Sequence, residues 1–355
     1  MTGEVWVLGA TGRTGRAVAT RLHQLECPLV LVGRDQQRLD ALAARLGGTP
    51  RTVAGTLDAA LIELQRAAPA VVLNTVGPFS ASAVRVARAC PPGTHYVDVA
   101  NELRAAQDIL DLDRDARDSG RVLVTGAGFG VLATEAVVLR LCEGQPVPSR
   151  VRVDALASLA TEPGAVGAAL AATIVETAAL GGRQVRGGRL VPTRTASDPL
   201  WLTTPDGDRL GTASGASGEL IAAWRASRAD AVVAASSLVP TGALARSALP
   251  VASAVLRLPG VAGLATRGLA RLSLRAQERP RPASWGHARV EWPSGAVREG
   301  WLRLGDAMDF TVAVASEVVR RLASGEGRPG AYTPGALFGP ALATGAGGQF
   351  IDQVQ

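Results

Sequence analysis

A glycine-rich turn close to the N-terminus constrains the fold more than any other feature of the sequence. The apolar run Val5–Leu8 passes directly into this turn, and apolar residues at helical spacing follow it. Glycines at G-x-x-G-x-x-G spacing allow a tight turn, and the N-terminus of the following helix attracts the pyrophosphate of a dinucleotide. The sequence therefore predicts that the turn binds a dinucleotide through Gly9, Ala10, Thr11, Gly12, Arg13, Thr14 and Gly15. The alternative is a strand–helix turn without a ligand.

The first third of the chain alternates short apolar runs with longer helical patterns. The runs typical of strands are Val5–Leu8, Leu29–Val32, Ala70–Asn74, Tyr96–Val99 and Val122–Val124, and the longest helical pattern is the charged segment Glu102–Ser119. Strands separated by helices are typical of right-handed βαβ units and a parallel sheet. We therefore expect an α/β protein in which residues 1–130 form a Rossmann-type, doubly wound parallel sheet.

After residue 130 the pattern changes to a mixture of helices and hairpins, and we expect a second, α+β substrate domain over residues 131–310. Its expected elements are a helix at Ala165–Leu180, loops and short strands at 183–218, short amphipathic helices within Ala229–Leu274, and a hairpin of His287–Trp292 with Val297–Leu304. The helix Thr311–Ala323 opens a C-terminal segment, residues 311–355, that we expect to return to the first domain.

The residues after the second expected strand bear on the choice of cofactor. Sites that prefer NAD commonly carry an acid here, which binds the ribose 2′-hydroxyl. This chain instead reads Gly33-Arg34-Asp35, where Gly33 leaves room and Arg34 offers a guanidinium fork to a 2′-phosphate. Arg13 could add a second positive charge, while Asp35 is placed to cap the next helix. The sequence therefore favours NADP(H), and the alternative is that Arg34 is a solvated surface residue.

Two further segments are expected at the carboxyl edge of the sheet, where open parallel sheets bind their ligands. The turn after the expected strand Ala70–Asn74 is predicted to hold the nicotinamide end of the cofactor through Thr75, Val76, Gly77, Pro78 and Phe79. Its alternative is an ordinary Gly-Pro turn. The glycine-rich run Gly126–Gly130 has one bulky member, Phe129, which is the candidate substrate contact.

Three residues are candidates for proton transfer in this cleft: Tyr96, Asp98 and Glu102. Period-two alternation places Tyr96 and Asp98 on one face of the expected strand Tyr96–Val99. A tyrosine can act as a general acid, and a carboxyl group can donate a proton or anchor a substrate. The structural alternatives are that Tyr96 is packed in the strand, that Asp98 caps a turn and that Glu102 begins a helix.

Composition excludes several kinds of chemistry and partner. The 37 basic residues are all arginine, so the chain can form no lysine Schiff base, Walker-type phosphate site or Tyr-x-x-x-Lys relay. The net charge of +6 comes from arginines interspersed with 31 acidic residues, without a nucleic-acid-binding motif, so we expect no nucleic-acid partner. The three cysteines and three histidines are scattered, which argues against a metal site.

The location of the protein is also an expectation from the sequence. No secretory signal is apparent, and the uncharged stretch Ala231–Ala245 is too short to cross a bilayer. We therefore expect a cytoplasmic protein without an integral membrane segment. An alternative is that the arginine-dotted apolar helices at 229–274 rest on a membrane surface.

Five motifs carry a resemblance to a known family. They are VLGATGRTG at Val7–Gly15, NTVGPF at Asn74–Phe79, THYVDVANE at Thr94–Glu102, GAGFG at Gly126–Gly130 and TPGALFG at Thr333–Gly339. Together they resemble the saccharopine dehydrogenase-like oxidoreductases, in particular the trans-acting enoyl reductase branch. The resemblance implies an NADP-binding Rossmann domain followed by an α+β domain that shapes the substrate site. Where the family often has Gly-Tyr-Asp before the last helix, this chain has Ala307-Met308-Asp309, so a substrate-facing tyrosine is missing.

The resemblance and the cofactor motif together imply a function. We expect an NADPH-dependent reductase that transfers hydride to a C=C or C=N bond of an apolar or polyketide-derived metabolite, free or carrier-bound, in secondary metabolism. One alternative is an imine or saccharopine-type reductase. Another is a non-catalytic NADP-sensing protein, similar to the NmrA-like regulators. A homodimer is compatible with the sequence.

Overall fold

The structure is a computed structural model that describes residues 3–48, 50–161 and 163–351. The chain divides into two compact units. The first unit consists of Met1–Ala100, Arg104–Gly128 and Thr311–Phe338, and the second unit of Asn101–Leu103, Phe129–Phe310 and Gly339–Gln355. The C-terminal segment is thus shared between the units, whereas the sequence suggested a single return to the first domain.

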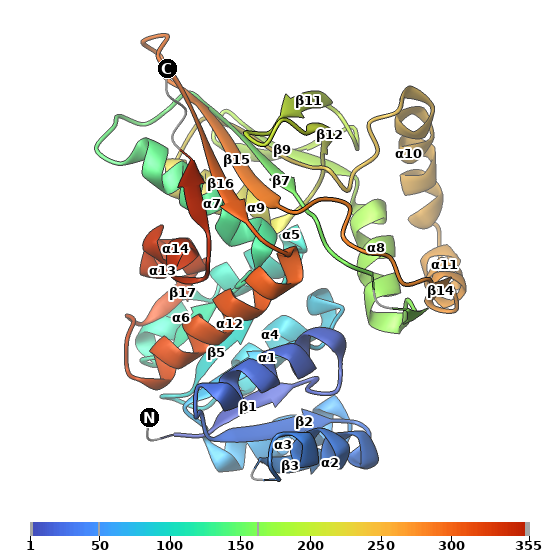
Figure 1. The fold of residues 1–355 in the computed structure, drawn as a ribbon, viewed down its shortest axis with the longest axis vertical. Helices are drawn as coiled ribbons and strands as arrows, with labels where there is room; N and C mark the ends of the chain where they lie inside the picture. The colour runs from blue at the N-terminus through green and yellow to red at the C-terminus, as the bar shows by residue number, and fades with distance from the viewer. Residues whose placement is uncertain (1–2, 49, 162, 352–355) are drawn as a thin grey trace. The chain divides into compact units, whose positions relative to one another are not determined.

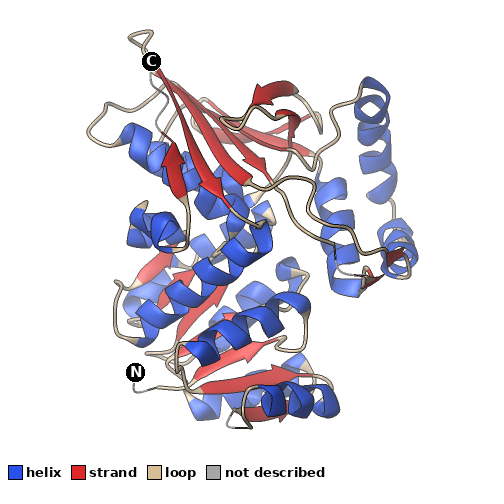
Figure 2. Ribbon diagram, in the orientation of Figure 1, coloured by secondary structure: helices blue, strands red, loops and turns tan. Residues whose placement is uncertain are grey.

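The first unit is built on a seven-stranded parallel sheet with helices on both faces (Figures 1 and 2). Its strands are β1 (Val5–Leu8), β2 (Leu29–Gly33), β3 (Arg51–Ala54), β4 (Val71–Asn74), β5 (His95–Asp98), β6 (Val122–Val124) and β17 (Gly330–Tyr332). Its helices are α1 (Arg13–Gln24), α2 (Gln36–Arg45), α3 (Leu57–Ala67), α4 (Phe79–Ala89), α6 (Asp113–Asp118) and α13 (Pro334–Phe338), with most of α5 (Leu103–Leu110) and α12 (Ala307–Ala323). The strand order β3-β2-β1-β4-β5-β6 is that of the Rossmann fold, which confirms the predicted fold class.

The central strands are mostly apolar and buried because helices cover both of their faces. Every residue of β1 and β4 is buried. The strand β17 extends the sheet beyond β6 and runs parallel to it. It is anchored there by the backbone N–H of Thr125, which donates to the carbonyl of Tyr332 at 3.0 Å. The sequence did not predict this strand, because its three residues lie in a tail rich in glycine and proline.

The second unit contains a mixed sheet with the order β10-β9-β13-β7-β15-β16-β18, and the ribbon of β11 and β12 joins it at β13. Its strands are β7 (Arg150–Leu156), β9 (Gly182–Arg186), β10 (Arg189–Thr193), β11 (Leu200–Thr203), β12 (Arg209–Ser214), β13 (Ala231–Ser236), β15 (Ser284–Glu291), β16 (Val297–Leu304) and β18 (Gln349–Ile351). The helices α7 (Phe129–Cys142) and α9 (Gly218–Ser227) pack against it, and α14 (Ala341–Gly345) precedes β18. A Cβ atom on Gly286 would lie 2.3 Å from the carbonyl oxygen of Ala133, so α7 approaches β15 as closely as glycine allows.

Two predicted elements differ from the structure. The apolar segment Ala229–Leu274 begins with the strand β13 and not with a helix, because Val232 and Val233 fill a central position between β7 and β9. The predicted helix Glu102–Ser119 is two helices, α5 and α6. They are separated by a turn in which Leu112 N donates to the carbonyl of Ile109 at 3.0 Å.

The second unit also carries a group of three helices that we call the helical layer. It consists of α8 (Ala168–Leu180), α10 (Ala243–Leu256) and α11 (Val261–Ala270), and α8 contacts both of the others. A short sheet of β8 (Gly164–Ala165) and β14 (Ser273–Leu274) accompanies it. Within the described residues no single helix is long and apolar enough to span a bilayer. Only α10 and α11 taken as a pair, bent by 116°, pass on length and composition.

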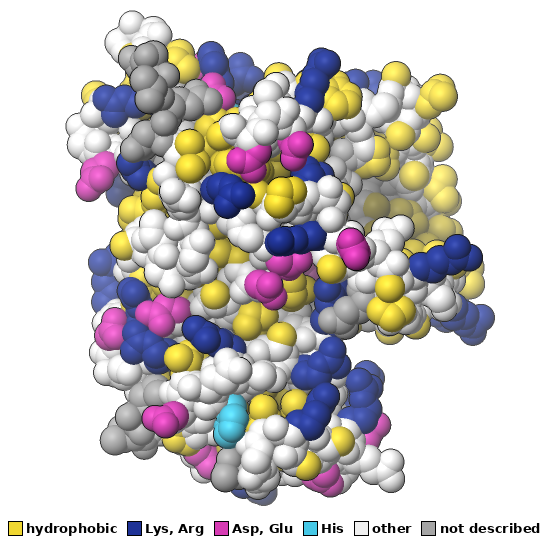
Figure 3. Space-filling model, in the orientation of Figure 1, with side chains coloured by type: hydrophobic (Ala, Val, Ile, Leu, Met, Phe, Trp, Pro, Cys, Tyr) yellow, Lys and Arg dark blue, Asp and Glu magenta, His cyan; other side chains and the backbone are white. Residues whose placement is uncertain are grey.

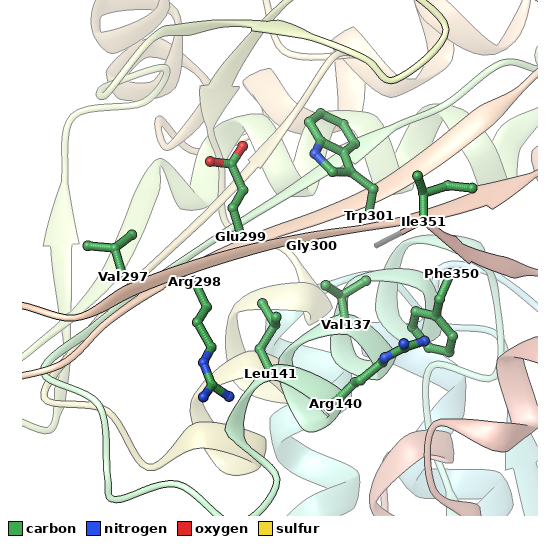
Figure 4. A pocket seen from close by; sticks show the side chains of 10 residues that line it. All are labelled: Val137, Arg140, Leu141, Val297, Arg298, Glu299, Gly300, Trp301, Phe350 and Ile351. Carbon is green, nitrogen blue, oxygen red and sulfur yellow. The ribbon is translucent and has the colours of Figure 1, made fainter. Parts of the chain in front are cut away.

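A buried polar cluster crosses the second sheet on the face opposite α7. His287 of β15 bonds through Nδ1 to Asp154 Oδ2 of β7 and through Nε2 to Glu299 Oε1 of β16, each at 2.9 Å. Arg152 pairs with Asp154 at 2.8 Å, and the ring of Trp301 lies 4.3 Å from the imidazole. Figure 4 shows Glu299 and Trp301 on one side of β16 and Arg298 on the other.

The charges of this cluster shift the pKa values of its members. Burial alone would lower the pKa of His287, but the hydrogen bonds and charges of Asp154 and Glu299 outweigh it and raise that pKa. Burial would raise the pKa of Asp154, yet the bonds from His287 and Arg152 lower it overall. The bond from His287 lowers the pKa of Glu299, aided by the charge of Arg289. The cluster therefore favours the protonated imidazolium form of His287 between two carboxylates.

His287→Gln is expected to change how the free energy of unfolding depends on pH. A histidine with a raised folded-state pKa adds stability that is complete below its unfolded pKa of about 6.5 and is lost as the pH rises through the folded value. The urea midpoint of the wild type should therefore fall above about pH 6.5, and that of His287→Gln should be lower but flat over the same range. His23→Gln, on α1, is the matched control and should keep the wild-type slope. Equal slopes in His287→Gln and the wild type would contradict an imidazolium at this position.

Candidate cofactor site and active site

The predicted ligand-binding edge of the first sheet is formed by the ends of β1, β2 and β4. Leu8, the last residue of β1, is paired with Val32 on one side and with Asn74 on the other. The strand order reverses direction between β1 and β4, and open α/β sheets bind ligands at such a switch point. The loops after β1 and β4 therefore leave the sheet next to each other.

The glycine loop after β1 is shaped by contacts that exclude larger residues. Gly9 has a φ of +79°, a region that favours glycine. A Cβ atom on Gly15 would lie 2.3 Å from the carbonyl oxygen of Gly9 and 2.8 Å from Thr75 Oγ1. Gly12 is the N-cap of α1 and brings no side-chain cap. The loop is thus a tight backbone cradle at a helix N-terminus, as a pyrophosphate requires.

A cavity of about 400 Å³ adjoins this cradle. Its lining combines three arginines with apolar and hydroxyl groups: Thr11, Arg16, Arg38, Ala41, Leu42 and Arg45. Arg38 Nη2 donates to the carbonyl oxygen of Thr11 at 3.1 Å, which links α2 to the glycine loop. No acidic side chain lines the cavity. An anionic ligand with a flat apolar part, such as a phosphorylated adenosine, fits this lining.

The lining of this cavity adds Arg38 to the candidates for binding a 2′-phosphate. Arg34 is exposed at the end of β2 and does not line the cavity, whereas Arg38 does. Asp35 accepts a hydrogen bond from Arg38 N at 3.1 Å, which confirms that Asp35 caps α2 and fixes Arg38 in the first turn. The signal for Arg38 in the sequence was its position one helical turn after Arg34, on the face of α2 that also carries Ala41, Leu42 and Arg45.

The loop after β4 lies against the glycine loop. Thr75 Oγ1 donates to the carbonyl of Leu8 at 2.7 Å, so Thr75 joins the two loops directly. Asn74 Oδ1 accepts from Val76 N at 3.0 Å, and Ser82 Oγ donates to the carbonyl of Val76. All five residues predicted to contact the cofactor in this loop are partly exposed: Thr75, Val76, Gly77, Pro78 and Phe79. Their contact with a nicotinamide remains a prediction.

Tyr96 and Asp98 face the same side of β5, as predicted, and lie in a buried hydrogen-bond network. Tyr96 OH donates to Asp98 Oδ2 at 2.9 Å and accepts from Asn74 Nδ2 at 3.3 Å. Asp98 Oδ1 accepts from Ala100 N, Thr125 Oγ1 and Gly126 N at 2.9 to 3.0 Å. Both side chains are fully buried. The network holds the ends of β4, β5 and β6 together at the binding edge.

This environment favours a structural role for the pair. Burial raises the pKa of Asp98 to about 6, against the lowering by its four hydrogen bonds. Burial and the charge of Asp98 also raise the pKa of Tyr96 well above its ordinary range. Every oxygen of the two side chains already has a partner, and neither residue reaches the surface. The geometry therefore favours the packed and capping alternatives over proton transfer by Tyr96 or Asp98.

In the second unit, Glu102 lies in a polar corner formed by the residues that follow β5. Its Oε2 accepts from Asn101 N at 3.1 Å, and its Oε1 accepts from Thr173 Oγ1 of α8 at 2.8 Å. Glu102 also pairs through its backbone with Ser217, just before α9. Phe129, the predicted substrate contact, is the first residue of α7 and is partly exposed. Glu102 thus ties α8 and α9 to the segment after β5.

The same corner contains a buried carboxyl group that the sequence did not single out, Glu219. Asn101 Nδ2 donates to Glu219 Oε1 at 3.3 Å, while Glu219 Oε2 has no hydrogen-bond partner among the described residues. A Cβ atom on Gly130 would lie 2.0 Å from Glu219 Oε1, so the carboxyl group occupies the space that a side chain at Gly130 would fill. Burial raises the pKa of Glu219, against hydrogen bonds from Ser217 and Asn101 that lower it.

A second cavity of about 350 Å³ lies away from these residues, between α7, β16 and β18 (Figure 4). Arg140 and Arg298 lie on the α7 side of β16, and the Arg140 guanidinium stacks over the Phe350 ring at 4.7 Å. None of the predicted site residues lines this cavity.

Comparisons with known proteins agree with this architecture. No family model matches the chain. Curated trans-acting enoyl reductases of Mycobacterium ulcerans (strain Agy99) and Mycobacterium leprae (strain TN) are 32% and 30% identical to it, each over 146 residues. The corresponding protein of Mycobacterium tuberculosis (strain ATCC 25618 / H37Rv) is 29% identical over the same length. These alignments cover 39% of this chain and 35% of each relative, so the match spans about a third of the length of the curated relatives.

A solved structure matches the whole chain in fold. Apo histidine-tagged saccharopine dehydrogenase (L-Glu forming) from Saccharomyces cerevisiae superposes with a TM-score of 0.59, covering 99% of this chain and 100% of that one at 11% identity. At this identity the likeness shows the fold alone, and a Rossmann-type fold agrees with the glycine cradle and the arginine-lined cavity. The resemblance stated from the sequence motifs is thereby confirmed. The chain has the fold of the saccharopine dehydrogenase-like oxidoreductases and is a distant relative of the trans-acting enoyl reductases.

Proposed function

We propose that this protein is an NADPH-dependent reductase that acts on a C=C or C=N bond of an apolar metabolite. The observation that carries the proposal is the arginine-lined cavity beside the glycine cradle. Bound NADPH supplies a hydride to the substrate, and the proton that completes the reduction comes from the protein or from water. The name of the curated relatives, trans-acting enoyl reductase, favours a C=C bond and a substrate carried by another protein.

The preference for NADPH over NADH follows from charge. The cavity contains Arg16, Arg38 and Arg45 and no acid. A 2′-phosphate gains charge-assisted hydrogen bonds from arginine, whereas a free 2′-hydroxyl is best bound by a carboxylate. Asp35, the nearest acid after β2, is engaged as the cap of α2. The cavity therefore contains arginines that can bind a 2′-phosphate, and it lacks the free carboxylate that NADH sites commonly use.

Glu219 is the best-supported proton donor. A donor must be protonated near neutral pH and must have an oxygen that is not committed to another bond. The raised pKa of Glu219 favours its protonated form, and its Oε2 has no hydrogen-bond partner among the described residues. The carboxyl group occupies the space that a side chain at Gly130 would fill, so it lies against the first turn of α7. After proton transfer the carboxylate is reprotonated from water.

Arg38→Ala is expected to weaken NADPH binding at least about tenfold, a loss of about 1.4 kcal/mol, and to leave NADH binding nearly unchanged. The measurement is a fluorescence titration of the wild type and each variant with both nucleotides. Arg114→Ala, at a position on α6 that is 92% exposed, is the matched control and should bind as the wild type does. Arg34→Ala should have a smaller effect than Arg38→Ala, because Arg34 does not line the cavity.

Two further outcomes of this titration bear on the proposal. Gly15→Ala should weaken both nucleotides alike, since its Cβ atom would press on the carbonyl oxygen of Gly9. If the wild type binds neither nucleotide, the reductase proposal fails. If it binds NADPH tightly but oxidises none with conjugated enones, enoyl thioesters or cyclic imines, the chain is a nucleotide-sensing protein.

Glu219→Gln is expected to reduce kcat by about 10² or more without changing the dissociation constant of NADPH. The wild-type rate should fall as the pH rises through the raised pKa of Glu219, because the donor then loses its proton, and the variant should lack this limb. Glu143→Gln, at the exposed end of α7, is the control, and Glu102→Gln tests the neighbouring acid. A Glu219→Gln variant that folds, binds NADPH and turns over at the wild-type rate would exclude Glu219 as the donor.

A further inference from the structure

The helical layer is apolar, yet very little of it is buried. In α10 the described side chains include one buried residue, Ser253, and α11 has none. In α8 the buried residues are Ala171 and Val175. A mainly apolar helix is normally enclosed by protein or lipid, because exposure of its side chains to water is unfavourable in free energy. These three helices therefore present an apolar surface without a protein cover among the described residues.

The exposed side chains of the layer include many of the largest aliphatic residues in the protein. On α10, Leu244 is 90% exposed, Val251 and Val255 follow at the spacing of one helical face, and the exposed Leu258 lies just after the helix. The other large exposed members are Leu170, Ile174, Leu264, Leu272 and Leu274. Figure 3 shows hydrophobic side chains gathered over this part of the second unit. Isolated exposed leucines are common on protein surfaces, but a contiguous group marks an interaction site.

The charges on α10, α11 and the segment that follows them are almost all positive, whereas α8 carries one acid, Glu176. Residues 243–279 contain the arginines Arg246, Arg257, Arg267, Arg271, Arg275 and Arg279 and a single acid, Glu278. Arg257 Nε donates to the carbonyl of Ala179 at the end of α8, and Arg246 Nε donates to the carbonyl of Ala196. The remaining four arginines are exposed, and none of them forms an ion pair with a described residue.

We propose that the helical layer docks on an anionic lipid surface. Amphipathic helices that lie in the headgroup region bury leucines at the acyl boundary and place arginines among the phosphates. The layer supplies both kinds of group at neighbouring positions, since Leu264 precedes Arg267 by one helical turn and Leu272 follows Arg271 directly. No helix has to cross the bilayer for this contact. The site is independent of the cofactor cavity, which lies in the first unit.

The same features argue against two other occupants. In a two-fold dimer of this chain each patch meets its own copy, so the unpaired arginines of the two copies would face each other. An acidic protein would complement the arginines but would not itself require so many exposed leucines on α10. A lipid surface with anionic headgroups can bury the leucines at its acyl boundary and pair the arginines with its phosphates. The dimer and the acidic protein are therefore outcomes that the test must separate from lipid binding.

The test is co-sedimentation of the full chain with vesicles of phosphatidylcholine alone or of phosphatidylcholine with phosphatidylserine. We expect the wild type to pellet with the anionic vesicles and to stay in the supernatant with the neutral ones. Leu244→Ser with Leu264→Ser should weaken binding at least about tenfold at any salt concentration. Arg267→Glu with Arg271→Glu should also weaken binding to the anionic vesicles at least about tenfold. Salt should weaken the binding of the wild type, because it screens the charges.

Matched controls lie outside the layer. Ile62→Ser on α3 and Val147→Ser replace aliphatic residues that are 55% and 57% exposed, against 63% for Leu264, and Arg114→Glu reverses an exposed arginine; all three should pellet as the wild type does. NADPH binding and the unfolding temperature should be unchanged in every variant, which excludes misfolding as the cause. Wild-type protein that remains in the supernatant with anionic vesicles would overturn the proposal. So would light scattering that shows a dimer which Leu244→Ser converts to a monomer without any effect on vesicle binding.

Discussion

The first turn of α1 meets the end of β1 at a distance that only glycine permits. The position of a Cβ atom on Gly15 is occupied by the carbonyl oxygen of Gly9, and Thr75 closes the same space from β4. Because the two loops are held in this way, the helix N-terminus, the glycine cradle and the arginine-lined cavity of α1 and α2 have fixed relative positions. The order of the sheet makes this edge the binding edge, and the contact at Gly15 gives it the shape of a nucleotide site.

Two buried carboxyl groups, Asp98 and Glu219, differ in their hydrogen-bond partners and therefore in the role that each can have. Asp98 and Glu219 both have raised pKa values because burial disfavours their charge. Asp98 accepts hydrogen bonds on both oxygens and joins the ends of three strands. Glu219 keeps one oxygen without a partner among the described residues. An unsatisfied buried polar atom costs stability, and such a cost is commonly retained where the atom has a task.

Local patterns in the sequence were sufficient for five of the seven strands of the first sheet and for the shape of the glycine turn. The glycine spacing, the strand–helix alternation and the capping role of Asp35 depend on neighbours within a few residues, and all three are present in the structure. Arg38 and Glu219 were missed because their roles depend on contacts with Thr11 and Gly130, which lie 27 and 89 positions away in the chain. The segment Ala231–Ser236 was predicted as helical for the same reason: it becomes a strand through pairing with β7 and β9, which are distant in the sequence. Tyr96 and Asp98 were correctly placed on one face, but their complete enclosure could not be deduced from alternation alone.

The strand β17 has a consequence for how the protein is made. It pairs with β6 although about 200 residues separate the two strands, so the first sheet is interrupted in sequence by nearly the whole second unit. During synthesis, β6 remains an unpaired edge until residue 332 has emerged from the ribosome, and unpaired edges invite association with other chains. Contacts of such high sequence separation also slow folding, because the intervening loop must close first. The first unit therefore depends on the completion of the second unit to protect its own edge, and the two are expected to mature together and not one after the other.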